Sequence, residues 1–198
     1  MTQQRDMLGR TTQFQYDALG RMTSRIGPDG VVTRYEYDAG GRLMAVVENY
    51  ILNGPVDKET NVRTAFGYDN NSNQTTSTDA RSNVTTQVYD SLDRRTRLTD
   101  PLNYTHLFTY TVRGELGKSR DALGRVTDYS YDNGGRLTTL DYPSSTPDVA
   151  YQYDKASNVL TMTDRLGATY YGYDPLNRME RRTRDGRAVH LHQHWRDR

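Results

Sequence analysis

The 198-residue chain has no cysteine, one tryptophan and almost no net charge, since 26 Lys and Arg residues oppose 25 Asp and Glu residues. Without cysteine there is neither a disulfide framework nor a thiolate metal site. Balanced charge gives no overall field toward nucleic acid or an anionic membrane, so nucleic acid is not an expected partner. The absence of cysteine does not decide the cellular compartment, because it fits both a protein of the reducing cell interior and a large secreted repeat protein.

Long hydrophobic segments are also missing. The chain has no run of 18 apolar residues, and residues 1–9 lack the basic and apolar regions of a signal peptide. The sequence therefore predicts no membrane insertion and no signal peptide within this chain.

What the chain does contain favours strands and turns. Hydrophobic residues make up 34% of it, and the mean hydropathy is −0.92. The aromatic residues are 16 Tyr, 3 Phe and 1 Trp, and there are 16 Gly. This composition is typical of strands and turns, and tyrosine can line a half-wet interior.

A short aromatic-x-Tyr-Asp motif recurs along the chain. The full copies are Phe14 to Asp17, Tyr35 to Asp38, Phe66 to Asp69, Tyr129 to Asp132, Tyr151 to Asp154 and Tyr171 to Asp174. Two copies are degenerate: Gln87 precedes Tyr89-Asp90, and Thr111 follows Phe108-Thr109-Tyr110. The second Tyr lies at 16, 37, 68, 89, 110, 131, 153 and 173, so the usual spacing is about 21 residues and one spacing is 31.

Each repeat is predicted to be strand, turn, strand, turn. A turn former often lies four residues after the Tyr, at Gly20, Gly41, Gly114, Gly135 or Asn177, and Arg follows that slot at 21, 42, 94, 136 and 178. The fullest copies read Y-D-x-x-G-R. A second turn comes later, at Asp29-Gly30, Asp100-Pro101, 121–124 or 164–167. Asp can bond turn amides, and Gly supplies the positive φ that such hairpins need.

The predicted fold class is all-β: tandem β-hairpin repeats forming one open, curved or spiralling antiparallel sheet. Aromatics at i and i+2 share one face of a strand, and we expect neighbouring hairpins to align them into cross-strand ladders. Eight repeats are expected over residues 1–186, with an insertion loop at about 48–61 around Asn53-Gly54-Pro55. Residues 187–198 are expected to be a disordered tail.

The repeated Y-D-x-x-G-R with its D-x-x-G partner turn resembles the Rhs or YD-repeat family of bacterial polymorphic toxins, toxin-complex C components and teneurins. The resemblance runs from about Asp6 to Gly186. It implies a hollow spiral shell that in the toxins encloses a C-terminal toxic domain. Asp174-Pro175-Leu176-Asn177 is the nearest match to the D-P-x-G core of such toxins, and it is the turn of the eighth repeat, so neither core nor cargo is carried over. Because the first repeat begins partway, at 6–9, we expect a fragment with exposed sheet edges.

Several residues have alternative interpretations. The recurring Asp residues could ligate cations or act in catalysis, but turn capping explains their repetition better. The Arg residues could bind phosphate or acidic glycans, yet salt bridges within turns or stacking on aromatic rings are favoured. A metal site could be formed by His190, His192 and His194, because residues at alternate positions of a strand share one face, but a frayed terminus is favoured. His106 has no other histidine near it in the sequence.

The sequence therefore predicts an architectural protein: wall of an encapsulating shell or a surface scaffold of a bacterial toxin, secreted or at the cell surface. Expected partners are other repeats of a longer chain or an encapsulated toxin domain. No enzyme activity, cofactor, metal or catalytic residue is expected. The alternative is a carbohydrate-binding cell-surface module that uses the tyrosine faces, and an enzyme is the third hypothesis.

Overall fold

The computed structural model describes residues 1–56, 59–143, 148–184 and 187–190, and these form strands and turns without a helix. The strands are β1 (Thr2–Arg5), β2 (Thr11–Tyr16), β3 (Met22–Ile26), β4 (Val32–Tyr37), β5 (Leu43–Glu48), β6 (Val62–Tyr68), β7 (Gln74–Thr78), β8 (Val84–Tyr89), β9 (Arg95–Thr99), β10 (Thr105–Tyr110), β11 (Leu116–Arg120), β12 (Val126–Tyr131), β13 (Leu137–Asp141), β14 (Val149–Tyr153), β15 (Val159–Asp164), β16 (Gly167–Tyr173), β17 (Met179–Arg184) and β18 (Arg187–His190). The predicted all-β class is confirmed.

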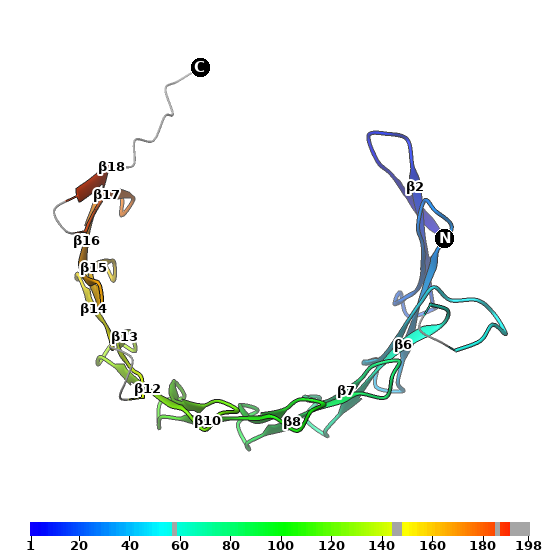
Figure 1. Ribbon diagram of the computed structural model, residues 1–198. Helices are drawn as coiled ribbons and strands as arrows, with labels where there is room; N and C mark the ends of the chain where they lie inside the picture. Colours follow the sequence, from blue (N-terminus) through cyan, green and yellow to red (C-terminus); the bar gives the residue numbers. More distant parts are fainter. Residues whose placement is uncertain (57–58, 144–147, 185–186, 191–198) are drawn as a thin grey trace. The chain divides into compact units, whose positions relative to one another are not determined.

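The strands form two units, Met1–Thr105 and His106–Arg198. Within each unit every strand pairs antiparallel with its neighbours along the chain, β1 to β9 in the first and β10 to β18 in the second. Figure 1 shows this as a regular progression of colour within each unit. Sequential pairing is what short hairpin turns impose, because no strand has to cross another.

A β-bulge marks the strand pair that flanks each Tyr-Asp turn. In β12–β13, Ser130 lies opposite Thr139 but Tyr131 lies opposite Leu137, so Thr138 is extra. The same shift recurs before Tyr16, Tyr37, Tyr68, Tyr89, Tyr110, Tyr153 and Tyr173. Pairs β3–β4, β7–β8 and β11–β12, which flank a second turn, keep an unshifted register. The two ends of a hairpin therefore differ in the strand register beside the turn, although their turn sequences are alike.

In β8, β10, β12 and β14 the residues of the motif alternate between half-buried and exposed, as predicted, but the aromatic residues do not form direct ladders. In β14, Tyr151 and Tyr153 are half-buried while Ala150 and Gln152 are exposed. Tyr151 lies opposite Met162 rather than another ring. Each repeat contributes two strands and only the first carries the motif, so successive aromatic strands lie about 10 Å apart. The expectation of cross-strand aromatic pairs was wrong for this reason.

Very few side chains are fully enclosed. Among the described residues the buried ones are Ala45, Val47, Ser24, Asn61 and Thr169. A sheet with half-exposed faces gains less stabilising free energy from apolar burial than a two-layer domain does. Hydrogen bonds and contacts between neighbouring hairpins must therefore provide much of its stability.

The insertion predicted near 48–61 is the connection between β5 and β6, and it contains the turn at Gly54, whose N–H donates to Ile51 O at 2.9 Å. At the other end of the chain, strands continue past residue 186, since β18 pairs with β17. Residues 191–198 lie outside the described residues.

Candidate functional site

One aspartate organises most of the hairpin turns. At Asp132, the backbone N–H donates to Arg136 O at 2.9 Å, and Gly135 N–H donates to Asp132 O at 3.0 Å. The carboxylate accepts Gly134 N–H at 2.8 Å and Arg136 N–H at 3.0 Å on Oδ1, and Arg136 Nε at 2.7 Å on Oδ2. The predicted role of the recurring aspartates as turn residues is confirmed.

The same geometry occurs at both ends of the hairpins, which sequence reasoning did not recognise. The five-residue turns whose first residue is aspartate begin at Asp6, Asp17, Asp38, Asp69, Asp79, Asp90, Asp100, Asp121, Asp132, Asp154 and Asp174. The fourth position always has positive φ: most often it is Gly before Arg, as in 38–42, or Ser before Asn, as in 79–83, and in the remaining turns it is Asp93, Asn103 or Asn177. Either partner donates to Oδ2, Arg42 Nε at 2.7 Å and Asn83 Nδ2 at 2.8 Å. A search for D-x-x-[GSN]-[RN] finds most of both turn sets.

Ser82→Gly is expected to raise the free energy of unfolding by about 0.5–1 kcal/mol, since Ser82 has φ of 64° and Gly adopts this region without a Cβ clash. Ser91→Gly, in the turn whose left-handed position is held by Asp93, is the matched control and should destabilise slightly through chain entropy. Urea denaturation followed by circular dichroism measures both. A loss of stability in Ser82→Gly would contradict the assignment of strain.

The degenerate fifth repeat keeps the turn with different chemistry. Thr111 N–H donates to Glu115 O at 2.8 Å, as an Asp would, and Gly114 N–H donates to Thr111 O at 3.0 Å. The Thr111 hydroxyl hydrogen bonds to the Glu115 carboxylate, so the acid and its partner have exchanged places. That hydrogen bond lowers the pKa of Glu115. Loss of the Asp therefore does not mean loss of the turn.

The second tyrosine of a repeat ties its hairpin to the preceding one. Tyr153 Oη donates to Leu137 O at 2.7 Å, and Leu137 is the residue opposite Tyr131 at the bulge of the previous repeat. The equivalent bonds run from Tyr37 to Met22, Tyr68 to Leu43, Tyr89 to Gln74, Tyr131 to Leu116 and Tyr173 to Val159, at 2.7–3.1 Å. A backbone carbonyl next to each of these bulges therefore accepts a hydrogen bond from a side chain of the following repeat.

Arginine makes a second link between the same repeats. The Arg136 guanidinium lies 4.8 Å from the centroid of the Tyr153 ring, and its Nη1 donates to Asp154 O at 2.8 Å. Arg42 repeats this in the first unit, 4.9 Å from the Tyr68 ring and 2.9 Å from Asp69 O. The predicted salt bridges and ring stacking are both confirmed, and each Arg thereby connects its own turn with the next one.

These hydrogen bonds set the titration of the turns. The N–H of Arg136, followed by its guanidinium, holds the pKa of Asp132 below its ordinary value of 3.8. The pKa is likewise lowered by turn hydrogen bonds at Asp6, Asp17, Asp38, Asp79, Asp90, Asp154 and Asp174. Burial raises the pKa of Tyr131, Tyr153 and Tyr173 above 10.0.

The thermal midpoint is therefore expected to be flat between about pH 5 and 9 and to fall outside that range. Lowered aspartate pKa values stabilise the fold above the unfolded pKa, and this contribution is lost as pH falls below about 4 through the folded values. Raised tyrosine pKa values contribute below about pH 10 and are lost as pH rises through the folded values. Calorimetry across pH measures the curve, and an unchanged midpoint down to pH 2 would contradict it.

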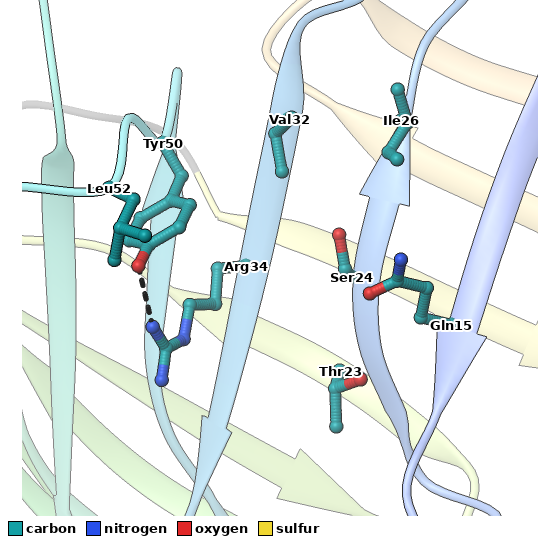
Figure 2. Close-up of a pocket in the computed structure, with 8 residues that line it drawn as sticks. All are labelled: Gln15, Thr23, Ser24, Ile26, Val32, Arg34, Tyr50 and Leu52. Atoms are coloured by element: carbon teal, nitrogen blue, oxygen red, sulfur yellow. Dashed lines mark hydrogen bonds between the residues drawn. The ribbon is translucent and has the colours of Figure 1, made fainter.

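The insertion loop forms a groove on the sheet of the first unit (Figure 2). The groove has a volume of about 420 Å³ and is lined by Gln15, Thr23, Ser24, Ile26, Val32, Arg34, Tyr50 and Leu52. Tyr50 and Leu52 come from the loop, and the other residues come from β2, β3 and β4. Arg34 Nη1 donates to Tyr50 Oη at 2.8 Å, so the loop is bonded to the sheet across the groove.

A buried asparagine holds this loop in shape. Asn61 is 8% exposed, and its Oδ1 accepts Ile51 N–H at 2.8 Å. Its Nδ2 donates to the carbonyls of Ile51, Gly54 and Pro55 at 3.1, 3.1 and 2.9 Å. Tyr50 N–H donates to Val32 O at 2.8 Å, which joins the loop to β4. The sequence predicted an insertion loop at about 48–61 but gave no signal for the groove.

Metal ligation has no support in the described part of the chain, where no three His, Asp or Glu side chains are grouped to hold an ion. Of the histidines considered for a metal site, His192 and His194 lie outside the described residues, and His190 is described only as part of β18. In the same described ranges, no helix is long and apolar enough to cross a membrane.

The fold and these contacts define a class of protein: a tandem β-hairpin array in which most repeats are bonded to the preceding one through a tyrosine hydroxyl, and several also through an arginine. A profile of the family Teneurin YD-shell matches residues 1–171. The chain belongs to this YD-shell family and is a structural repeat segment of it. A search of curated proteins gave no match.

Solved structures with the same fold include the crystal structures of TcdB2-TccC3-TEV and TcdB2-TccC3-Cdc42, each 18% identical with a TM-score of 0.54. The first match covers 87% and the second 91% of this chain. The Photorhabdus luminescens Tc holotoxin pore is 17% identical, with a TM-score of 0.53 over 90% of this chain. This chain spans 13% of the length of each of these chains.

Proposed function

We propose that this chain is a length of wall in an encapsulating shell of a bacterial toxin, secreted or carried at the cell surface, and that it catalyses no reaction. The observation that carries the proposal is the repeated link from one hairpin to the next, such as Tyr153 to Leu137 with Arg136 on the Tyr153 ring. Such links supply the continuity that a wall needs. The fold shared with the TcdB2-TccC3 structures and the YD-shell profile support the same role.

The non-catalytic role is supported by how the ionisable groups are used. The turn aspartates with lowered pKa are each engaged by the amides and the Arg or Asn of their own turn, as Asp38 is by Arg42. A catalytic carboxylate pair would lie at one distinct site, whereas these aspartates occupy equivalent positions in successive turns. The expected partners are further YD repeats and an enclosed toxic domain.

A chimera tests the proposal. The structurally matching repeats of TccC3 are replaced with residues 1–184 of this chain, and protection of the C-terminal region from protease is compared with unaltered TccC3. As a wall segment, the chain should preserve that protection, and a matched chimera carrying Tyr68→Ala and Tyr153→Ala should weaken it. A chimera that folds, by circular dichroism, but leaves the C-terminal region as exposed as a free domain would overturn the proposal.

A further inference from the structure

The groove beside the insertion loop lies at the one place where the repeat spacing is 31 instead of about 21 residues. The wall contacts recur in many repeats, but Tyr50 and Leu52 belong to a segment without an equivalent in the other repeats. Loops that interrupt a regular scaffold often carry binding function. The groove is therefore the feature of the described residues least explained by wall architecture.

Five of the six residues that the sheet contributes to the groove form two parallel rows of side chains (Figure 2). The polar row is Gln15, Ser24 and Arg34, which lie opposite one another across β2, β3 and β4. The apolar row is Ile26 and Val32, which lie opposite each other in the same two strands, β3 and β4. Because the rows are two residues apart along each strand, they are separated by about 6.7 Å.

The polar row has a positive excess. Arg34 is the charged residue of the lining, and its Nε lies 3.9 Å from Glu36 Oε1. Glu36 is shared with Arg63, whose Nη2 lies 3.3 Å from Oε2. One carboxylate therefore serves two guanidinium groups on this face. The Arg34 side chain is 47% exposed, so its charge is accessible to a ligand.

We propose that this groove binds an extended peptide segment that carries an acidic side chain two residues from an aliphatic one. Side chains at i and i+2 of an extended chain share a face and are about 6.7 Å apart, which matches the separation of the two rows. The acidic group would meet Arg34 and Gln15, and the aliphatic group would pack on Ile26, Val32 and Leu52. A peptide is favoured over a small molecule because the groove is only partly enclosed, and small ligands bind where most of their surface is buried.

Nuclear magnetic resonance of the full chain, with labelled Ile, Val and Leu methyl groups, tests the proposal. The probe is a capped pentapeptide with glutamate second and leucine fourth. It should shift the methyl signals of Ile26, Val32 and Leu52 and saturate with a Kd on the order of 1 mM. Replacing the glutamate with glutamine should weaken binding at least about fivefold, since the charge-assisted bond to Arg34 is lost.

Arg34→Gln should weaken binding of the glutamate peptide to a similar extent. Arg63→Gln is the matched control, because Arg63 also contacts Glu36 and lies in the same cross-strand row, outside the groove lining. It should leave Kd within about twofold. Should Arg34→Gln disturb the loop, the comparison of the two peptides on the unaltered protein still decides the question.

Equal binding of the glutamate and glutamine peptides would overturn the proposal, as would the absence of saturable shifts at 10 mM peptide. Shifts confined to Val46, on the other face of β5, would do the same. If 4-methylpentanoate bound as tightly as the peptide, the groove would be a small-molecule site and the peptide assignment would be wrong.

Discussion

Tyr153→Ala is expected to lower the free energy of unfolding by about 3 kcal/mol, and Tyr153→Phe by about 1–1.5 kcal/mol. The phenylalanine variant loses only the hydrogen bond from Tyr153 Oη to Leu137 O. The alanine variant also loses the ring on which the Arg136 guanidinium packs, at 4.8 Å. Urea denaturation followed by circular dichroism gives both values.

Tyr170→Phe is the matched control for that experiment. Tyr170 belongs to the next motif strand, is 53% exposed and points to the opposite face from Tyr171. Its loss of a hydroxyl should cost less than about 0.5 kcal/mol. If Tyr153→Phe and Tyr170→Phe had the same effect, the hydroxyl bond between repeats would not contribute to stability. A broadened transition in Tyr153→Ala would indicate that the array separates at this repeat, as expected for one-dimensional repeat proteins.

Asn61→Gly is expected to release the insertion loop while leaving the strands folded. Glycine accepts the φ of 52° at this position, so the change removes the side-chain amide without backbone strain. Four hydrogen bonds are lost, including that from Ile51 N–H to Oδ1 at 2.8 Å. The Ile51 amide should exchange with solvent about 10–100 times faster, which corresponds to about 1.4–2.7 kcal/mol of local stability.

The control for the loop is Asn53→Gly, since Asn53 also has positive φ, at 59°, and its side chain is exposed. This variant should leave exchange of the Ile51 amide within about threefold. Exchange in β4 and β5 should change little in either variant. Global unfolding of Asn61→Gly would show that the loop is part of the sheet's cooperative unit, contrary to this prediction.

Sequence reasoning worked best where the interacting groups lie within five residues of one another. Asp132 contacts Gly134 and Arg136, so the motif itself contains the whole turn. It also worked for strand faces, since alternation along β14 needs only the period of an extended chain. It failed on the aromatic ladders because the identity of the opposite residue depends on register. Tyr151 opposite Met162 follows from the bulge and the turn length together.

The amino-acid sequence by itself determined the period of the array, the strands and both sets of turns. These follow from local chemistry: a carboxylate beside turn amides, a residue that accepts positive φ, and alternating faces. The tertiary structure alone decided which carbonyl each tyrosine hydroxyl reaches, which ring each arginine covers, and that Tyr50 and Arg34 meet beside a groove. Those contacts join residues 14 or more positions apart, and only strand register and the path of the loop bring them together.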